Sequence, residues 1–129
     1  MVFYLDTSAF IKLLVDVEHA DKLRAFVHSS DDLFVSSDLL RIEGLRAARS
    51  HSQEVLRQAR IALEGVTLLS ISATICEFAA DLDPLILRSL DALHLASALS
   101  LGDELQAVIT YDDRLSQACA LHGVSAIAP

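Results

Sequence analysis

The chain has 129 residues, of which 53% are apolar, so it has the length and the apolar content of a single domain, expected over residues 1–129. No run approaches the roughly 18 apolar residues of a membrane span, and MVFYLDTSAF does not look like a signal peptide, so a cytoplasmic protein is expected. The formal charge of −8 argues against nucleic-acid binding through a broadly basic surface, but it leaves room for an enzyme whose bound cations supply positive charge.

Short apolar runs predict strands, and the stretches between them carry helical periodicity and capping residues. Strands are expected at residues 2–5, 33–36, 66–70, 107–110 and, at one edge, 124–127. Helices are expected at residues 8–14, 20–29, 38–50, 53–64, 72–81, 89–101 and 112–121. Thr7 or Ser8 could cap the first helix, and Asp38 is expected to cap the third. This alternation predicts an α/β fold of three layers, α/β/α, around a mainly parallel sheet of four to five short strands.

Four acidic residues fall where this topology brings the chain to one edge of the sheet. Asp6 directly follows the first strand, and Asp112 follows the fourth strand by two residues. Glu43 lies about five residues into the helix after the second strand, and Asp91 lies near the start of the helix before the fourth. We expect all four at the carboxyl ends of the strands, where open α/β sheets bind ligands.

The helical context of Asp91 indicates more than a solvated surface charge. Asp91 shares a helix stripe with Leu87, Leu95 and Ala98, and Glu43 is similarly surrounded by apolar neighbours on its helix. Two carboxylates ~4 Å apart repel by about 4 kcal/mol at an effective dielectric constant near 20. A cluster of four therefore predicts hard divalent cations with oxygen ligands, Mg²⁺ or Mn²⁺, which could activate water against a phosphodiester.

Each acidic residue also has a structural explanation. Asp6 could cap the first helix and Asp112 the last, while Glu43 could pair with Arg41 or Arg46 along its own helix. Asp91 is the hardest of the four to explain structurally, because an acidic side chain facing a core requires a partner.

Four fragments in order carry a family resemblance that runs nearly end to end: LDTSAFIKLL, SSDLLRIEGLRAAR, LRSLDALHLASAL and VITYDDRLSQACALHGV. With them the chain resembles the PIN-domain family, specifically the VapC-type toxins of bacterial toxin–antitoxin pairs. The resemblance implies a PIN-like domain and an Mg²⁺- or Mn²⁺-dependent endoribonuclease that cuts structured RNA, often tRNA or rRNA. It also implies inhibition by a cognate VapB-type antitoxin and, commonly, a homodimer.

The resemblance also implies roles for single residues. Asp6, Glu43, Asp91 and Asp112 correspond to metal-binding, catalytic carboxylates, and hydrolysis by metal-activated water would leave 5′-phosphate and 3′-hydroxyl ends. Ser8 and Thr110 fall where small hydroxyls line the family's site, although helix capping and the end of a strand also explain them. Asp113 could exchange roles with Asp112, or be a solvated acid in the first turn of its helix.

Basic, histidine and cysteine residues supply weaker candidates. Arg46 and Arg114 are the arginines that we expect to contact phosphate, and Arg88 lies beside the acidic positions. His94, three residues after Asp91, could be a general base, but a structural histidine with internal hydrogen bonds is favoured. The remaining histidines, at positions 19, 28, 51 and 122, show no ligand spacing, and both cysteines are expected to pack as small apolar side chains.

Two other classes of protein compete with the nuclease. Phosphoryl-transfer domains of the receiver and dehalogenase-like kinds also place acidic residues after the first strand, but they usually use a lysine near the later strands. Here the only lysines are Lys12 and Lys22, so that class is disfavoured. A non-catalytic α/β module could instead use the acidic cluster to hold a structural cation or a basic peptide.

Overall fold

The computed structural model describes residues 1–15 and 20–129. His19, one of the histidines without ligand spacing, lies outside these ranges. In the described part of the chain, five parallel strands form one sheet in the order β3-β2-β1-β4-β5. The strands are β1 (Val2–Leu5), β2 (Leu33–Ser37), β3 (Thr67–Leu69), β4 (Leu105–Ile109) and β5 (Ala126–Ile127). The helices are α1 (Thr7–Leu14), α2 (Ala20–Ser29), α3 (Asp38–His51), α4 (Gln53–Leu63), α5 (Ala73–Asp81), α6 (Ser89–Leu99) and α7 (Asp113–Leu121), with a 3-10 turn at Gly102–Glu104.

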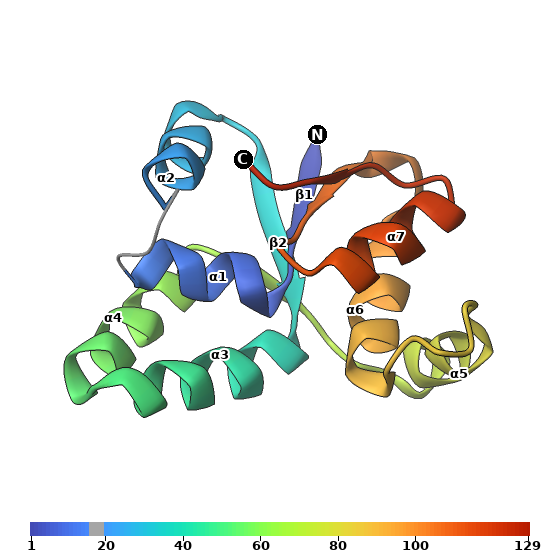
Figure 1. Ribbon diagram of the computed structural model, residues 1–129, viewed down its shortest axis with the longest axis horizontal. Helices are drawn as coiled ribbons and strands as arrows, with labels where there is room; N and C mark the ends of the chain where they lie inside the picture. The colour runs from blue at the N-terminus through green and yellow to red at the C-terminus, as the bar shows by residue number, and fades with distance from the viewer. Residues whose placement is uncertain (16–19) are drawn as a thin grey trace.

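The sheet lies between two helical layers, as the alternating pattern predicts. Helices α1 to α4 lie on one side of the strands and α5 to α7 on the other (Figure 1). Because successive strand residues point to opposite faces, Phe3 and Leu5 pack toward Leu23 of α2, whereas Tyr4 packs against Leu95 of α6. Both faces of the sheet are therefore covered, which confirms the three-layer α/β/α prediction.

The start of α1 departs from the sequence prediction in a way that matters for the site. Asp6, rather than Thr7 or Ser8, occupies the N-cap position, where its extended backbone lets the side chain accept a hydrogen bond from the Ala9 amide. Thr7 and Ser8 lie within the first helical turn, so their hydroxyls are directed to other partners. The predicted capping role of Asp6 is thus correct, and it holds the carboxylate at the end of β1.

Other boundaries differ by one or two residues. Asp38 is the first residue of α3 and not its cap, because β2 runs on to Ser37, which takes the N-cap position. Strand β4 starts at Leu105, and α6 ends at Leu99, before the turn in which Gly102 adopts a positive φ of 59°.

Three further features bear on the sequence predictions. The packing prediction is correct for the buried Cys119 and wrong for Cys76, which lies on the exposed side of α5. Gly44 allows α3 to approach α1, because a Cβ there would lie 3.1 Å from the Phe10 ring. Within residues 1–15 and 20–129, no helix combines the length and the apolar character needed to cross a bilayer.

Candidate functional site

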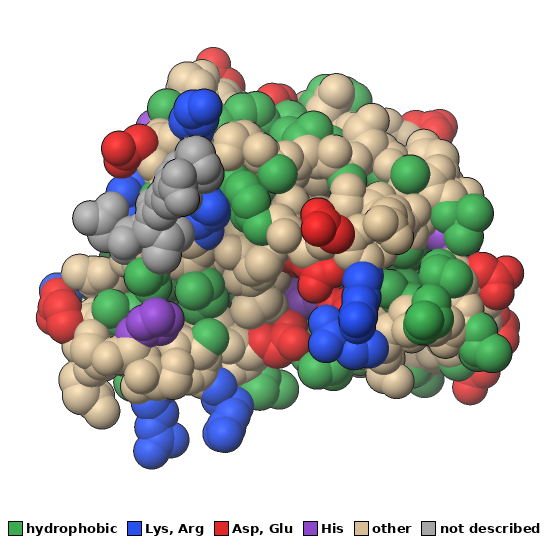
Figure 2. Space-filling view, in the orientation of Figure 1, with side chains coloured by type: hydrophobic (Ala, Val, Ile, Leu, Met, Phe, Trp, Pro, Cys, Tyr) green, Lys and Arg blue, Asp and Glu red, His purple; other side chains and the backbone are tan. Residues whose placement is uncertain are grey.

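The four acidic residues lie at the carboxyl edge of the sheet, as the topology predicts. Asp6 and Asp112 follow the ends of β1 and β4 and cap α1 and α7. Glu43 lies in the second turn of α3, after β2, and Asp91 lies in the first turn of α6. Figure 1 shows these helices approaching one another where the central strands end. The space-filling view of this face has acidic side chains at its centre, next to a basic and a histidine side chain (Figure 2).

Asp6 is the most enclosed of the four carboxylates, with an exposed fraction of 4%. Its Oδ1 accepts hydrogen bonds from the Ser8 hydroxyl at 2.6 Å and the Ala9 amide at 2.9 Å, and its Oδ2 accepts one from the Thr110 hydroxyl. Burial raises the pKa of Asp6, and these three donors offset only part of that effect. The ionised form of Asp6 therefore lacks compensation for its burial, as expected of a side chain that binds a cation.

Ser8 and Thr110 connect the turn after β1 to the turn after β4. The Ser8 oxygen accepts a hydrogen bond from the Tyr111 amide at 2.9 Å, and the Thr110 oxygen accepts one from the Asp112 amide at 3.0 Å. Each hydroxyl thus donates to Asp6 while it holds the neighbouring segment. Both residues contact the Asp6 carboxylate, and Thr110 brings the backbone of Asp112 next to it.

Glu43 is held by partners that the sequence did not indicate. Its Oε1 accepts hydrogen bonds from the Thr7 hydroxyl at 2.7 Å and from Nε2 of His94 at 2.8 Å. Burial alone would raise the pKa of Glu43, but the hydrogen bonds from His94 and Thr7 outweigh it and lower the pKa. The pairing with Arg41 or Arg46 that the sequence allowed is absent from the described part of the chain, where Arg41 pairs with Asp38 at 3.7 Å.

His94 joins Glu43 to the core. Its side chain is buried, with an exposed fraction of 3%, and its Nδ1 lies 2.8 Å from the Tyr4 hydroxyl. Burial raises the pKa of Tyr4 to about 12, so Tyr4 keeps its proton and donates it to Nδ1. In the neutral imidazole the remaining proton is then on Nε2 and faces Glu43. The prediction of a structural histidine with internal hydrogen bonds is confirmed, and its partner is one of the four acidic residues.

Asp91 and Asp112 share one ion-pair partner, the guanidinium group of Arg88. Arg88, at the N-cap of α6, places Nε 3.3 Å from Oδ2 of Asp91 and Nη2 3.7 Å from Oδ2 of Asp112. Asp91 is thus mostly buried rather than fully enclosed, with a side-chain exposure of 17%, and it has an ion-pair partner. The partner that a half-buried Asp91 requires is therefore Arg88, which the helix stripe of Leu87 and Leu95 did not indicate.

The remaining candidates stay at the periphery. Asp113 and Arg114 are exposed in the first turn of α7, and Arg46 is exposed on α3. Asp112 is therefore the acid of this pair that has contacts at the site, through Arg88 and the Thr110 hydroxyl.

The four carboxylates are neighbours linked by other side chains, not a preformed metal cage. Within residues 1–15 and 20–129, no three His, Cys, Asp or Glu side chains are arranged to hold a metal ion. Thr110 lies between Asp6 and Asp112, Arg88 lies between Asp112 and Asp91, and His94 joins Glu43 to the helix of Asp91. Each of the four carboxylates thus has at least one oxygen paired with a donor, which relieves part of the mutual repulsion of the acidic groups.

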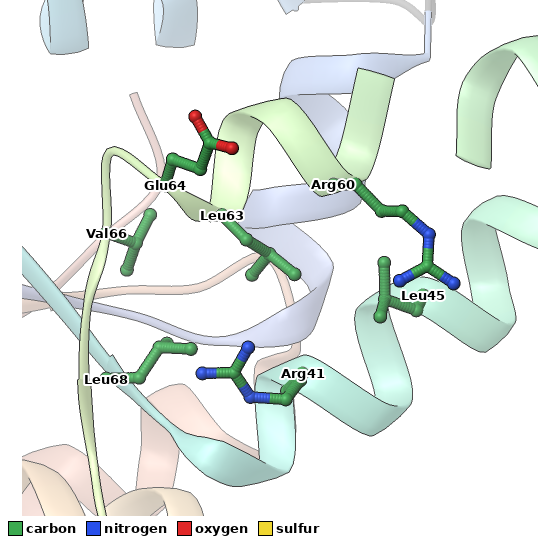
Figure 3. A pocket seen from close by; sticks show the side chains of 7 residues that line it. All are labelled: Arg41, Leu45, Arg60, Leu63, Glu64, Val66 and Leu68. Atoms are coloured by element: carbon green, nitrogen blue, oxygen red, sulfur yellow. The ribbon is translucent and has the colours of Figure 1, made fainter. Parts of the chain in front are cut away.

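A hollow of about 510 Å³ lies elsewhere, between α3, α4 and β3. It is lined by Arg41, Leu45, Arg60, Leu63, Glu64, Val66 and Leu68, and Figure 3 shows the guanidinium groups of Arg41 and Arg60 beside its leucine side chains. A single carboxylate, that of Glu64, belongs to its lining. Hydrolytic chemistry therefore points to the acidic edge of the sheet and not to this hollow.

Comparisons with known proteins identify the family and the fold of the chain. The sequence model of the PIN domain matches residues 3–121. Ribonuclease VapC46 of Mycobacterium tuberculosis is 39% identical over 126 residues, which cover 98% of this chain and 96% of that protein. The crystal structure of VapC20 from the same species, described as a sarcin-ricin loop cleaving toxin, has a TM-score of 0.79 at 19% identity and covers 98% of this chain and 99% of that one. VapBC2 from Rickettsia felis, bound to a promoter DNA fragment, contains a chain with a TM-score of 0.71 at 14% identity, with coverage of 99% and 98%.

Proposed function

Because the chain belongs to the PIN-domain family, we propose that it is a VapC-type endoribonuclease toxin that hydrolyses structured RNA and is inhibited by a VapB-type antitoxin. The observation that carries the proposal is the buried Asp6 carboxylate at the carboxyl edge of the sheet, beside Glu43, Asp91 and Asp112. A binding module could use the same carboxylates to hold a structural cation, so RNA cleavage that is lost on removal of one carboxylate is what separates the two functions.

The donor set fits a divalent cation such as Mg²⁺ or Mn²⁺. Asp6, Glu43, Asp91 and Asp112 offer carboxylate oxygens only, the ligands that hard divalent cations prefer. Its three hydrogen-bond donors only partly compensate the burial of the Asp6 carboxylate, which supports a cation at this edge. When bound, such an ion neutralises the charge that develops on the scissile phosphate and lowers the pKa of a coordinated water.

The chain's own residues orient the carboxylates. Ser8, Ala9 and Thr110 fix both oxygens of Asp6, and Thr7 and His94 hold Oε1 of Glu43, which leaves Oε2 without a hydrogen bond among the described residues. This network limits rotation of the two side chains, so they can meet a ligand with little reorganisation.

The reaction proposed is hydrolysis at phosphorus. A water molecule adds to the phosphodiester in line with the 3′ oxygen, and the bond between phosphorus and that oxygen breaks. The products carry a 5′-phosphate and a 3′-hydroxyl, and the ribose 2′-hydroxyl takes no part. A 2′,3′-cyclic phosphate among the products would contradict this reaction.

We propose that the exposed guanidinium groups of Arg46 and Arg114 contact RNA phosphates. An antitoxin segment could use a mainly apolar hollow of about 300 Å³ that α1, α2 and α4 border, where Leu14 and Val27 form part of the lining. A homodimer and a cytoplasmic location remain predictions, which light scattering of the purified protein and cell fractionation would test.

The proposed function is tested by expressing the wild-type chain briefly in cells and mapping new RNA 5′ ends. We expect discrete sites with wild type and none with Asp91→Asn. Asp112→Asn and Asp113→Asn form a matched pair, since both remove one charge at the same helix start and Asn remains a good cap. Loss of cleavage in the Asp112 variant alone would assign the fourth acid, and cleavage by Asp91→Asn at the wild-type rate would contradict the proposed site. Labelling of wild type by acetyl phosphate without RNA cleavage would favour phosphoryl transfer instead.

A further inference from the structure

We propose that Arg88 is a built-in counter-ion that occupies Asp91 and Asp112 in the metal-free protein and competes with the divalent cation for them. The inference rests on the proposed function, because it assumes that these carboxylates bind metal. It concerns a residue for which neither the family resemblance nor the four acidic positions supply a role.

The position of Arg88 makes it a bridge between two elements. Its Nε lies 3.3 Å from Asp91 on its own helix, and its Nη2 lies 3.7 Å from Asp112 in the turn between β4 and α7. One guanidinium thus neutralises part of the charge of two acidic side chains that would otherwise repel each other. In both contacts the acceptor is Oδ2, so each carboxylate uses this oxygen for Arg88 rather than for a metal.

The exposure of the three side chains indicates that the arginine can leave. Arg88 has an exposed fraction of 64%, whereas Asp91 and Asp112 have exposed fractions of 17% and 30%. The carboxylates therefore lie further inside the protein, and the guanidinium that covers them lies on the solvent side. Arg88 makes no capping hydrogen bond with its side chain, so its withdrawal leaves the start of α6 unchanged.

The absence of a preformed metal cage among the described residues fits this competition. A cation that binds between Asp91 and Asp112 must replace the guanidinium, because two positive charges at the same oxygens would repel each other. The ion pairs of Arg88 thus stabilise the metal-free protein and lower its affinity for metal by the same factor, as required for linked equilibria.

The test is titration of Mn²⁺ into the metal-free protein by calorimetry, with wild type, Arg88→Gln and a matched control, Arg41→Gln. Arg41 also pairs with an acidic side chain three residues away and has a comparable exposed fraction of 57%. It lies in the first turn of α3, directly after β2 and therefore near the same edge of the sheet. We expect Arg88→Gln to bind Mn²⁺ about three- to tenfold more tightly than wild type, the effect of losing two partly exposed ion pairs. Arg41→Gln is expected to bind like wild type.

Thermal unfolding supplies a second measurement that does not depend on activity. Metal-free Arg88→Gln is expected to melt below wild type, and the difference is expected to disappear in saturating Mn²⁺, where the arginine is already displaced. An Mn²⁺ affinity of Arg88→Gln that is equal to or weaker than that of wild type would overturn the inference. So would an equal gain in Arg41→Gln, because that would indicate a general charge effect. A wild-type chain that binds no Mn²⁺ would count against the metal site itself, a separate failure.

Discussion

Asp6→Asn is expected to stabilise the metal-free protein while it abolishes RNA cleavage. The asparagine oxygen can still accept the hydrogen bonds from Ser8 and Ala9, so the cap of α1 survives. The substitution loses the hydrogen bond that the Thr110 hydroxyl donates, worth about 1 kcal/mol. It also removes a charge whose burial outweighs all three donors, as the raised pKa of Asp6 shows. We expect a net gain of about 1 kcal/mol in the free energy of unfolding at pH 7, a usual size when a functional residue is replaced by one that suits the fold.

The pH dependence of this gain follows from the direction of the shift. Well below the ordinary Asp pKa of 3.8 the carboxyl group of Asp6 is protonated in both the unfolded and the folded chain, and the variant has little advantage. As the pH rises, the unfolded wild-type chain loses the Asp6 proton first, since the folded pKa is higher. Wild type therefore loses stability between 3.8 and its folded pKa, and the advantage of Asp6→Asn grows through that window and then stays constant.

Urea denaturation of both proteins, at several pH values and in the presence of a chelator, measures this difference. An Asp6→Asn variant that is less stable than wild type at pH 7, with a difference independent of pH, would refute the reasoning. Saturating Mn²⁺ is expected to make wild type the more stable of the two proteins. The cation binds and stabilises folded wild type, whereas the variant has lost the charged ligand at position 6.

Other predictions concern the packing around the site. Tyr4→Phe leaves the buried Nδ1 of His94 without its donor and is expected to cost about 1–2 kcal/mol in urea denaturation; no loss would argue against the hydrogen bond. Gly44→Ala places a Cβ 3.1 Å from the Phe10 ring and is expected to destabilise the protein by about 1–3 kcal/mol, seen as a lower melting temperature; an unchanged melting temperature would mean that α1 and α3 separate easily. Burial raises the pKa of Cys119 to about 11, so its thiol should resist a thiol reagent at pH 8 until the chain unfolds; rapid labelling of this residue in the native protein would contradict its burial.

The amino-acid sequence by itself determined the layers and the edge of the sheet at which the acidic residues gather. Short apolar runs and the helical stretches between them are local signals, and parallel strands bring their carboxyl ends to one edge whatever the side chains do. The positions of Asp6 and Asp112 follow from that rule. The sequence also indicated a cap for α1, because capping residues lie next to the helix they cap. It could not decide between Asp6, Thr7 and Ser8, since the capping residue is the last one with an extended backbone before the helix.

The tertiary structure alone decided which side chains accompany the four acids. Tyr4, Glu43 and His94 are 39 to 90 positions apart along the chain, and they meet because α3 and α6 pack beside the same strand end. Arg88 was visible next to Asp91, but its second contact, with Asp112, depends on how α6 and α7 lie against each other. Spacing along a helix reports contacts within that helix only. The counter-ion of the site, and the histidine that orients Glu43, could therefore be recognised only once the helices had been placed around the sheet.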